Sequence, residues 1–395
     1  MTPRIMPPFA ALWMLAGCSV DEISISSPTP APTAPISVQV TPSLPRLAAG
    51  PHLGMITGFD PLNAERAEQA MQRYQQARSS GATIGRIQID WAELEPAPGQ
   101  YDEQALADAF EDPGLEGMNL VVLLSTLDSD GLTVPEYFVE DDSLRDGLTL
   151  ASPEVVDAFS AFLDWLGPQL ARRSVWLVSI ANEPLGPIED GLASEPDAVT
   201  FYSAAMDQWN EEVPEIGITA TFTIAAPDSI PRLFETVRSR SDIVSFNYYC
   251  LSGDIEVTGR DDWEERLAQM KADAGDREIF LQELGCPVGY SPRARATAIG
   301  GSLDNQVRFF EFFGEAFATD PQLRAATMFQ LYDWSPELAA MFGDTVREEG
   351  ATLAGDRLEE WLATSGFLRW EDSFERPAWR IWLAQLERVR EARGD

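Results

Sequence analysis

Two glutamates lie at the ends of two apolar segments, and this setting suggests acid–base chemistry. Glu183 ends the run VWLVSIANEP (175–184), and Glu283 lies near the end of EIFLQELGC (278–286), 100 residues further along the chain. A buried carboxylate costs free energy unless it is paired or takes part in chemistry. Two carboxylates on either side of a cleft can cleave a glycosidic bond, because one donates a proton while the other attacks the sugar.

The segments that carry these glutamates belong to a regular alternation of predicted strands and helices. The predicted strands cover residues 52–59, 83–91, 118–126, 175–182, 218–226, 242–250, 278–286 and 325–334. Helical patterns cover residues 64–80, 153–171, 197–212, 261–274 and 303–318. Apolar strands followed by helices indicate a parallel sheet covered by helices. Eight strands in about 345 residues predict an α/β fold, a single (β/α)8 TIM barrel, rather than an open sheet with a glycine-rich phosphate loop.

Catalytic groups of such barrels lie at the carboxyl ends of the strands. Five of the predicted strands carry polar or aromatic residues near their carboxyl ends or, for Arg86, inside the strand: Arg86 and Trp91, Asn182 and Glu183, Asn247 and Tyr249, Glu283, and Trp334. We expect these side chains to meet around one cleft. The two glutamates should then lie with their carboxyl groups about 5–5.5 Å apart, the separation typical of cleavage with retained configuration.

The segments ANEP (181–184) and QELG (282–285) resemble the strand ends of glycoside hydrolase clan A, the retaining barrel enzymes that include the family 5 and family 10 glycanases. This resemblance implies that Glu183 is the acid/base and that Glu283 is the nucleophile. It also implies that Asn182 contacts the sugar 2-hydroxyl, that the partner is a carbohydrate, and that no cofactor is needed.

Further residues receive roles from the same resemblance. Arg86 would lie near the nucleophile, Tyr249 would donate a hydrogen bond to it, and Trp334 would form the floor under the sugar. Trp91 belongs to DWAELEPAPGQYD (90–102), which is similar to the Trp–Glu–Pro–Gly–Tyr segment after the second strand in several of these families. Asn247 departs from the pattern, because many family 5 members have a histidine there.

Four of these residues also have a purely structural interpretation. Glu183 could cap a helix, Glu283 could be a buried partner of Arg86, and Trp91 and Trp334 could be core aromatics. Two function classes follow: a retaining endo-β-glycanase or β-glycosidase, and a carbohydrate-binding lipoprotein that keeps the barrel without turnover. The two glutamates favour the enzyme, whereas the departure at the sixth strand favours the binding protein.

The first 48 residues indicate an export signal and a spacer. Residues 1–18, MTPRIMPPFAALWMLAGC, contain a positive residue, an apolar stretch too short to span a bilayer, and a final LAGC. This segment resembles a bacterial lipobox, which implies that Cys18 is diacylated; a plain signal peptide is the alternative. Residues 19–48 form a Pro/Ser/Thr-rich tether and residues 49–395 the barrel domain. Ser19 after the cysteine favours a lipid-anchored protein of the outer membrane.

The net charge and the residue types argue against several classes of partner and of chemistry. The formal net charge of −36 over 395 residues disfavours nucleic acid and anionic headgroups as partners, because like charges repel. No histidine–cysteine cluster has zinc spacing and no Gly-x-Ser-x-Gly segment occurs in the sequence. We therefore expect neither a metal nor a cofactor, and we expect a monomer.

The cysteines allow one disulfide. Lipidation of Cys18 would leave Cys250 and Cys286 as an even pair in an oxidising compartment. Both follow the ends of neighbouring predicted strands, where their Cα atoms can come within disulfide distance. A bridge beside the predicted nucleophile and two free buried thiols are equally compatible with this pattern.

Overall fold

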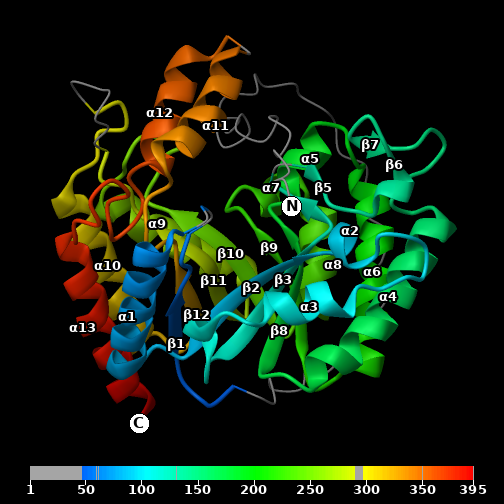
Figure 1. The fold of residues 1–395 in the computed structure, drawn as a ribbon, viewed down its shortest axis with the longest axis horizontal. Helices are drawn as coiled ribbons and strands as arrows, with labels where there is room; N and C mark the ends of the chain where they lie inside the picture. Colours follow the sequence, from blue (N-terminus) through cyan, green and yellow to red (C-terminus); the bar gives the residue numbers. More distant parts are fainter. Residues whose placement is uncertain are drawn as a thin grey trace, which may run out of the picture.

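The computed structural model of the chain describes residues 47–58, 60, 62–129, 131–289, 297–348 and 350–394. Eight parallel strands close into a barrel in the order β1-β12-β11-β10-β9-β8-β3-β2, which confirms the predicted (β/α)8 fold. Figure 1 shows these strands at the centre with helices around them. The barrel strands are β1 (His52–Met55), β2 (Ile84–Asp90), β3 (Asn119–Ser125), β8 (Val175–Asn182), β9 (Gly217–Phe222), β10 (Ile243–Tyr249), β11 (Glu278–Gly285) and β12 (Leu323–Met328).

Local signals in the sequence set the ends of the helices. The helix predicted over residues 64–80 begins after Asn63, whose side chain accepts from the backbone N–H of Arg66, and ends at Gly81 with φ of 119°. The helices are α1 (Ala64–Ser80), α2 (Trp91–Leu94), α3 (Glu103–Ala109), α4 (Pro153–Ala171), α5 (Leu185–Glu189), α6 (Glu195–Glu212), α7 (Ala226–Ser229), α8 (Pro231–Arg240), α9 (Arg260–Ala274), α10 (Leu303–Thr319), α11 (Pro336–Glu348), α12 (Thr352–Leu362) and α13 (Pro377–Arg393).

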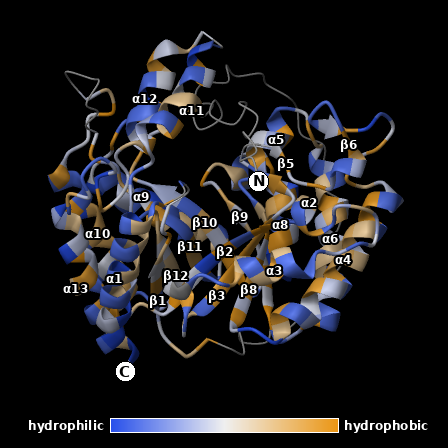
Figure 2. Cartoon of the chain, in the orientation of Figure 1, coloured by the Kyte–Doolittle hydropathy of each residue, from blue (hydrophilic) through white to orange (hydrophobic). Residues whose placement is uncertain are grey.

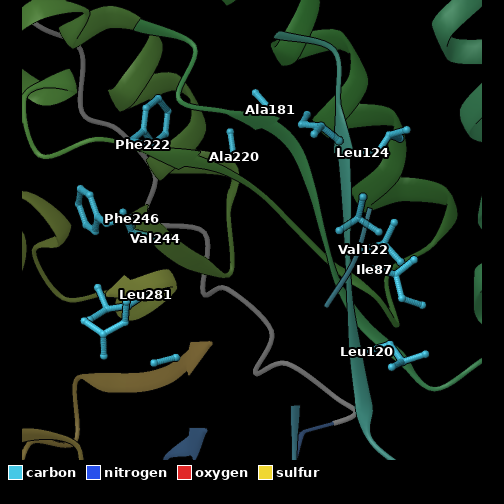
Figure 3. Packing of buried hydrophobic residues seen from close by; sticks show 14 of the residues in the cluster. Ile87, Leu120, Val122, Leu124, Ala181, Ala220, Phe222, Val244, Phe246 and Leu281 are labelled. Atoms are coloured by element: carbon cyan, nitrogen blue, oxygen red, sulfur yellow. The ribbon is translucent and has the colours of Figure 1, made fainter. Parts of the chain in front are cut away.

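Alternation of side chains along the strands produces two layers of packing. The outward-facing layer packs against the helices as one large hydrophobic cluster, of which Figure 3 shows a part. Figure 2 shows the corresponding contrast between largely hydrophobic strands such as β3 and β8 and helices such as α1 and α13, which carry many hydrophilic residues. A smaller inward-facing cluster fills the barrel where the strands begin: Leu47, Ile84, Val121, Trp176, Leu177, Ile243, Phe280 and Ala325.

Leu47 belongs to the packed domain rather than to the tether. Its side chain is buried in the inward-facing cluster. The guanidinium of Arg324 donates to the carbonyls of Leu47 at 3.2 Å, Ala48 at 2.5 Å and Gly50. The domain therefore includes two residues that the sequence pattern assigns to the tether, whereas Cys18 and the rest of residues 1–46 lie outside the described residues.

Short elements surround the opposite end of the barrel, where the strands end. Two small antiparallel hairpins, β4 (Leu127–Asp128) with β5 (Gly131–Leu132) and β6 (Val139–Glu140) with β7 (Ser143–Leu144), follow β3. In Figure 1 the α11–α12 pair stands at this end on one side, and α5, β6 and β7 stand on the other. Within the described part of the chain, no helix is long and apolar enough to cross a membrane.

The predicted eighth strand, 325–334, is wrong at its C-terminal end. β12 ends at Met328, six residues before Trp334. The chain beyond it still bonds to the ends of the neighbouring strands, through Phe329 N–H to the carbonyl of Leu284 at 3.0 Å and Leu331 N–H to that of Ile56 at 2.9 Å. It also bonds to a later segment, because Leu368 N–H donates to the carbonyl of Leu331 at 2.7 Å. The apolar pattern of this stretch therefore reflects burial between the barrel rim and the C-terminal segment, and Trp334 does not lie at a strand end.

Candidate active site

Glu183 follows β8 directly and is held in an unfavourable backbone conformation. Its φ is 50°, in the left-handed region that non-glycine residues rarely adopt. Its side chain is buried, and its N–H donates to the carbonyl of Thr221 in β9 at 2.8 Å. Such strain costs of order 1–3 kcal/mol and persists only where the surrounding structure imposes it, which is common at functional sites.

Glu283 reaches the barrel interior because β11 contains an irregularity. Phe246 of β10 pairs with Leu281, whereas the next residue, Asn247, pairs with Glu283, so that Gln282 is an extra residue in β11. A bulge of this kind redirects the side chains that follow it. The carboxylate of Glu283 accepts hydrogen bonds from Arg86 Nη1 at 2.5 Å and from the Tyr249 hydroxyl.

A second set of hydrogen bonds surrounds Glu183. Asn247 Nδ2 donates to Glu183 Oε1 at 2.8 Å and to Asn182 Oδ1 at 3.0 Å. Asn182 Nδ2 donates in turn to Asp128 Oδ1 at 2.9 Å. The structure thus brings together six of the predicted site residues, on or directly after β2, β8, β10 and β11: Arg86, Asn182, Glu183, Asn247, Tyr249 and Glu283.

The surroundings of Glu183 raise the pKa of its carboxyl group. Burial raises the pKa of Glu183 to about 8, the negative charge of Glu283 adds to this rise, and the hydrogen bond from Asn247 opposes it. Burial and the charge of Glu283 likewise raise the pKa of Tyr249 well above its ordinary value, so its hydroxyl remains a donor. At neutral pH the arrangement holds a protonated Glu183 close to a Glu283 that is paired with Arg86.

A cavity of about 460 Å³ lies beside Glu183. It is lined by residues of or after β8, β9 and β10 and by α9, and Glu183, Asn247 and Tyr249 form part of its wall. Apolar surface makes up the larger part of its wall, which also carries the carboxylates of Glu189 and Asp228 and the guanidinium of Arg266. A ligand in this cavity would therefore lie next to the Glu183 carboxyl group.

Two predicted site residues, both tryptophans, pack against helices. Trp91 is fully buried: its ring packs against Phe159 of α4 at 4.8 Å, and its Nε1 donates to Glu95 at 2.7 Å. The ring of Trp334 packs against Phe342 of α11, with centroids 5.1 Å apart. Of the two interpretations for Trp91, the structural one describes its observed position, because the segment turns its ring towards the helices.

Sequence reasoning missed two aromatic residues that contact Tyr249. Phe329 directly follows β12, and its ring meets that of Tyr249 edge-on at 5.4 Å. Trp361 of α12 meets the same ring at 4.9 Å. No local signal in the sequence separates these two from other core aromatics, because their contacts with Tyr249 depend on how distant segments pack together.

Cys250 and Cys286 form a disulfide, with Cα atoms 5.0 Å apart. Cys250 directly follows Tyr249, and Cys286 comes three residues after Glu283. Of the two alternatives that the sequence allows, the structure contains the bridge. It fastens together the ends of β10 and β11, the strands that carry Tyr249 and Glu283.

Replacing both cysteines by serine is expected to lower the free energy of unfolding by about 3–4 kcal/mol, because a crosslink across 36 residues restricts the unfolded chain. The midpoint of guanidinium-induced unfolding measures this effect. Adding a reductant should move the wild-type midpoint towards that of the double variant and leave the variant unchanged. Equal midpoints for oxidised wild type and variant would show that the bridge does not form.

Two other buried polar residues, His52 and Asp333, have structural partners. His52 lies at the start of β1, with Nδ1 2.8 Å from the Thr83 hydroxyl and Nε2 2.9 Å from the carbonyl of Ala48. Asp333 forms a buried, two-pronged ion pair with Arg376 at 2.6 and 2.7 Å. Over the described ranges, no group of three or more His, Cys, Asp or Glu residues is arranged to hold a metal ion.

No protein-family model and no curated protein matches the sequence. Solved structures do match. GH5_18 from Streptomyces cattleya in complex with GlcNAc is 18% identical, with 87% of this chain and 81% of that chain covered and a TM-score of 0.63. A variant of that protein in complex with Manβ1-4GlcNAc gives the same identity and coverage and a TM-score of 0.62. The exo-β-1,4-mannosidase Op5Man5 from Opitutaceae bacterium strain TAV5 is 14% identical, with 90% and 63% covered and a TM-score of 0.61. At these identities the likeness shows a shared barrel fold.

Proposed function

We propose that the protein is a retaining glycoside hydrolase that cleaves β-glycosidic bonds by a two-glutamate double displacement. The observation that carries this proposal is the pairing of two buried carboxyl groups in different states. Glu183 has a pKa of about 8, and the Glu283 carboxylate accepts from Arg86 and Tyr249. The fold and the ligands named for the similar structures support the same class of reaction.

The two steps follow from these states. Glu283 attacks the anomeric carbon and forms a covalent ester, while Glu183 gives its proton to the departing oxygen. The negative charge of Glu283 disappears in this step, so the pKa of Glu183 falls and its carboxylate can accept a proton from water. The resulting hydroxide equivalent attacks the anomeric carbon, Glu283 leaves, and the sugar retains its configuration.

We further propose that the substrate is a neutral or amino sugar glycoside rather than a uronide. In the described part of the site, Arg86 is bonded to Glu283, and the adjoining cavity contains more carboxylates than cations. Asp90, at the end of β2, is a further acidic group, and burial raises the pKa of its carboxyl to about 6. An anionic sugar would meet repulsion here, and the mannose-containing ligand of one similar structure points to β-mannosides.

A panel of aryl β-glycosides tests the function. Release of the aryl group from a β-mannoside or another neutral β-glycoside, with NMR showing a β-configured first product, is the expected result. Turnover of the β-glucuronide alone would contradict the substrate class, and an α-configured first product would remove Glu283 from the role of nucleophile. Binding of glycans without turnover of any member would instead favour the carbohydrate-binding alternative.

The rate should depend on pH through Glu183. Only the protonated acid can assist departure of the leaving group, so kcat/KM is expected to fall about tenfold per pH unit above a pKa of about 8. Initial rates between pH 6 and 10 on a glycoside with a poor leaving group measure this limb. A substrate that needs no proton donor should lack it, and an identical limb on both substrates would assign the titration to another group.

We also propose that Cys18 anchors the protein to a bacterial membrane through a lipid, on the basis of the lipobox-like LAGC sequence. Wild-type protein should partition into detergent, whereas Cys18→Ser should appear in the soluble fraction or remain unprocessed. Labelling with a fatty-acid analogue provides a direct measurement. A serine variant that partitions and migrates like the wild type would contradict lipidation.

A further inference from the structure

Side-chain hydrogen bonds connect β4 with Glu183. Asp128 Oδ1 accepts from Asn182 Nδ2 at 2.9 Å, Asn182 Oδ1 accepts from Asn247 Nδ2 at 3.0 Å, and Asn247 Nδ2 also donates to Glu183 Oε1 at 2.8 Å. All four side chains are buried, with 4–7% of their surface exposed. Asp128 lies outside the residues that the sequence pattern singles out, because it follows β3 in a two-residue strand.

The direction of this chain is determined at its Asp128 end. The backbone N–H of Ser129 can only donate, and it donates to Asp128 Oδ1 at 2.8 Å. An ionised carboxylate accepts and does not donate, so Asn182 must turn its NH₂ group towards it. The oxygen of Asn182 then faces Asn247, which must in turn present its own NH₂ group.

We propose that Asp128 is a positioning residue: its carboxylate fixes the orientation of the Asn182 and Asn247 amides, so that Asn247 donates a hydrogen bond to Glu183. The importance of this orientation for turnover rests on the proposed function. The orientation itself can be measured in the free protein. Without Asp128, rotation of the Asn247 amide would place its oxygen, instead of its NH₂ group, against Glu183.

The two orientations favour different charge states of Glu183. An NH₂ group stabilises the carboxylate, whereas an amide oxygen stabilises the protonated acid by accepting from it. Other groups act on the same carboxyl: Glu283 from β11 and Asp128 raise its pKa, Arg86 from β2 lowers it, and the neutral Tyr249 faces it from β10. The Asn247 bond therefore provides the fixed donor that the carboxylate needs when it acts as the base in the second step.

Two uncharged replacements separate the hydrogen bond from the charge. Asp128→Asn keeps an acceptor oxygen, because the Ser129 N–H still selects the orientation of the new amide. Asp128→Leu has a similar size and removes the acceptor. Titration of the Glu183 carboxyl by ¹³C NMR in free protein, assigned with Glu183→Gln, should show Glu183 as a roughly tenfold weaker acid in Asp128→Leu than in Asp128→Asn.

Identical titration of Glu183 in the two variants would overturn the proposal. If Asp128→Leu does not fold by circular dichroism, Asn182→Ala breaks the chain one residue closer, and there too Glu183 should be a weaker acid than in Asp128→Asn. For kinetics, kcat/KM on a glycoside with a poor leaving group should show its alkaline limb at higher pH in Asp128→Leu than in Asp128→Asn. Lack of turnover by the wild type would refute the proposed function and leave the NMR comparison decisive for Asp128.

Discussion

Glu283→Ala is expected to reduce kcat/KM by about 10⁴-fold or more on every β-glycoside that the wild type hydrolyses. The carboxylate forms the covalent bond to the sugar, and no other described side chain accepts from both Arg86 and Tyr249. Activated leaving groups should not rescue this variant, because the missing group is the nucleophile rather than the acid. Stopped assays with aryl glycosides of different leaving-group pKa measure the loss.

Glu278→Ala is the matched control, because this glutamate lies on the same strand at the opposite end of the barrel. Its carboxylate lies 3.4 Å from Arg324 Nε, and its side chain is half exposed. The control variant should keep wild-type kcat/KM, and both variants should unfold at similar temperatures. Activity of Glu283→Ala within about tenfold of this control would refute the role of Glu283 as nucleophile.

Glu183→Ala should have a selective effect. With leaving groups that require a proton, kcat/KM should fall about 10²–10⁴-fold, the usual contribution of a general acid. With a dinitrophenyl glycoside the first step should proceed nearly unimpaired, and the covalent intermediate should accumulate because no base activates water. Added azide should restore turnover and give a β-glycosyl azide, since azide needs no base.

The product of azide rescue distinguishes the two glutamates. A β-azide from Glu183→Ala places this residue at the acid/base position on the face of the leaving group. An α-azide would place the missing carboxyl on the opposite face and exchange the two assignments. An equal loss on all leaving groups, without rescue, would indicate a structural role, in which Glu183 holds the end of β8.

Much of the fold could be predicted because its signals are local. The helices at residues 64–80 and 153–171 have their predicted bounds, since a capping asparagine or an early proline marks their starts. The predicted end of β12 is wrong because apolar residues beyond Met328 are buried between the barrel rim and the chain around Phe367, although the regular strand has ended. Periodicity reports burial but does not identify what covers a segment.

In the candidate site, too, local features could be predicted from the sequence and features that depend on long-range packing could not. Glu183 and Glu283 are strand-end residues, and the sequence places them there. The irregularity at Gln282 that turns Glu283 inward depends on pairing between β10 and β11, which a single strand does not encode. Asp128 and Trp361 reach the site on segments whose positions are set by long-range packing, so no local pattern indicates them.

The burial of Leu47 bears on how the enzyme would meet its substrate. The residue lies where the strands begin, whereas Glu183 and Glu283 lie where they end, so the chain enters the domain from the base of the barrel. If Cys18 is lipid-anchored as proposed, the tether would join the barrel at its base. The end of the barrel that carries Glu183 and Glu283 would then be the end away from this attachment. Polymers too large to diffuse between the enzyme and the membrane would then still have access to the two glutamates.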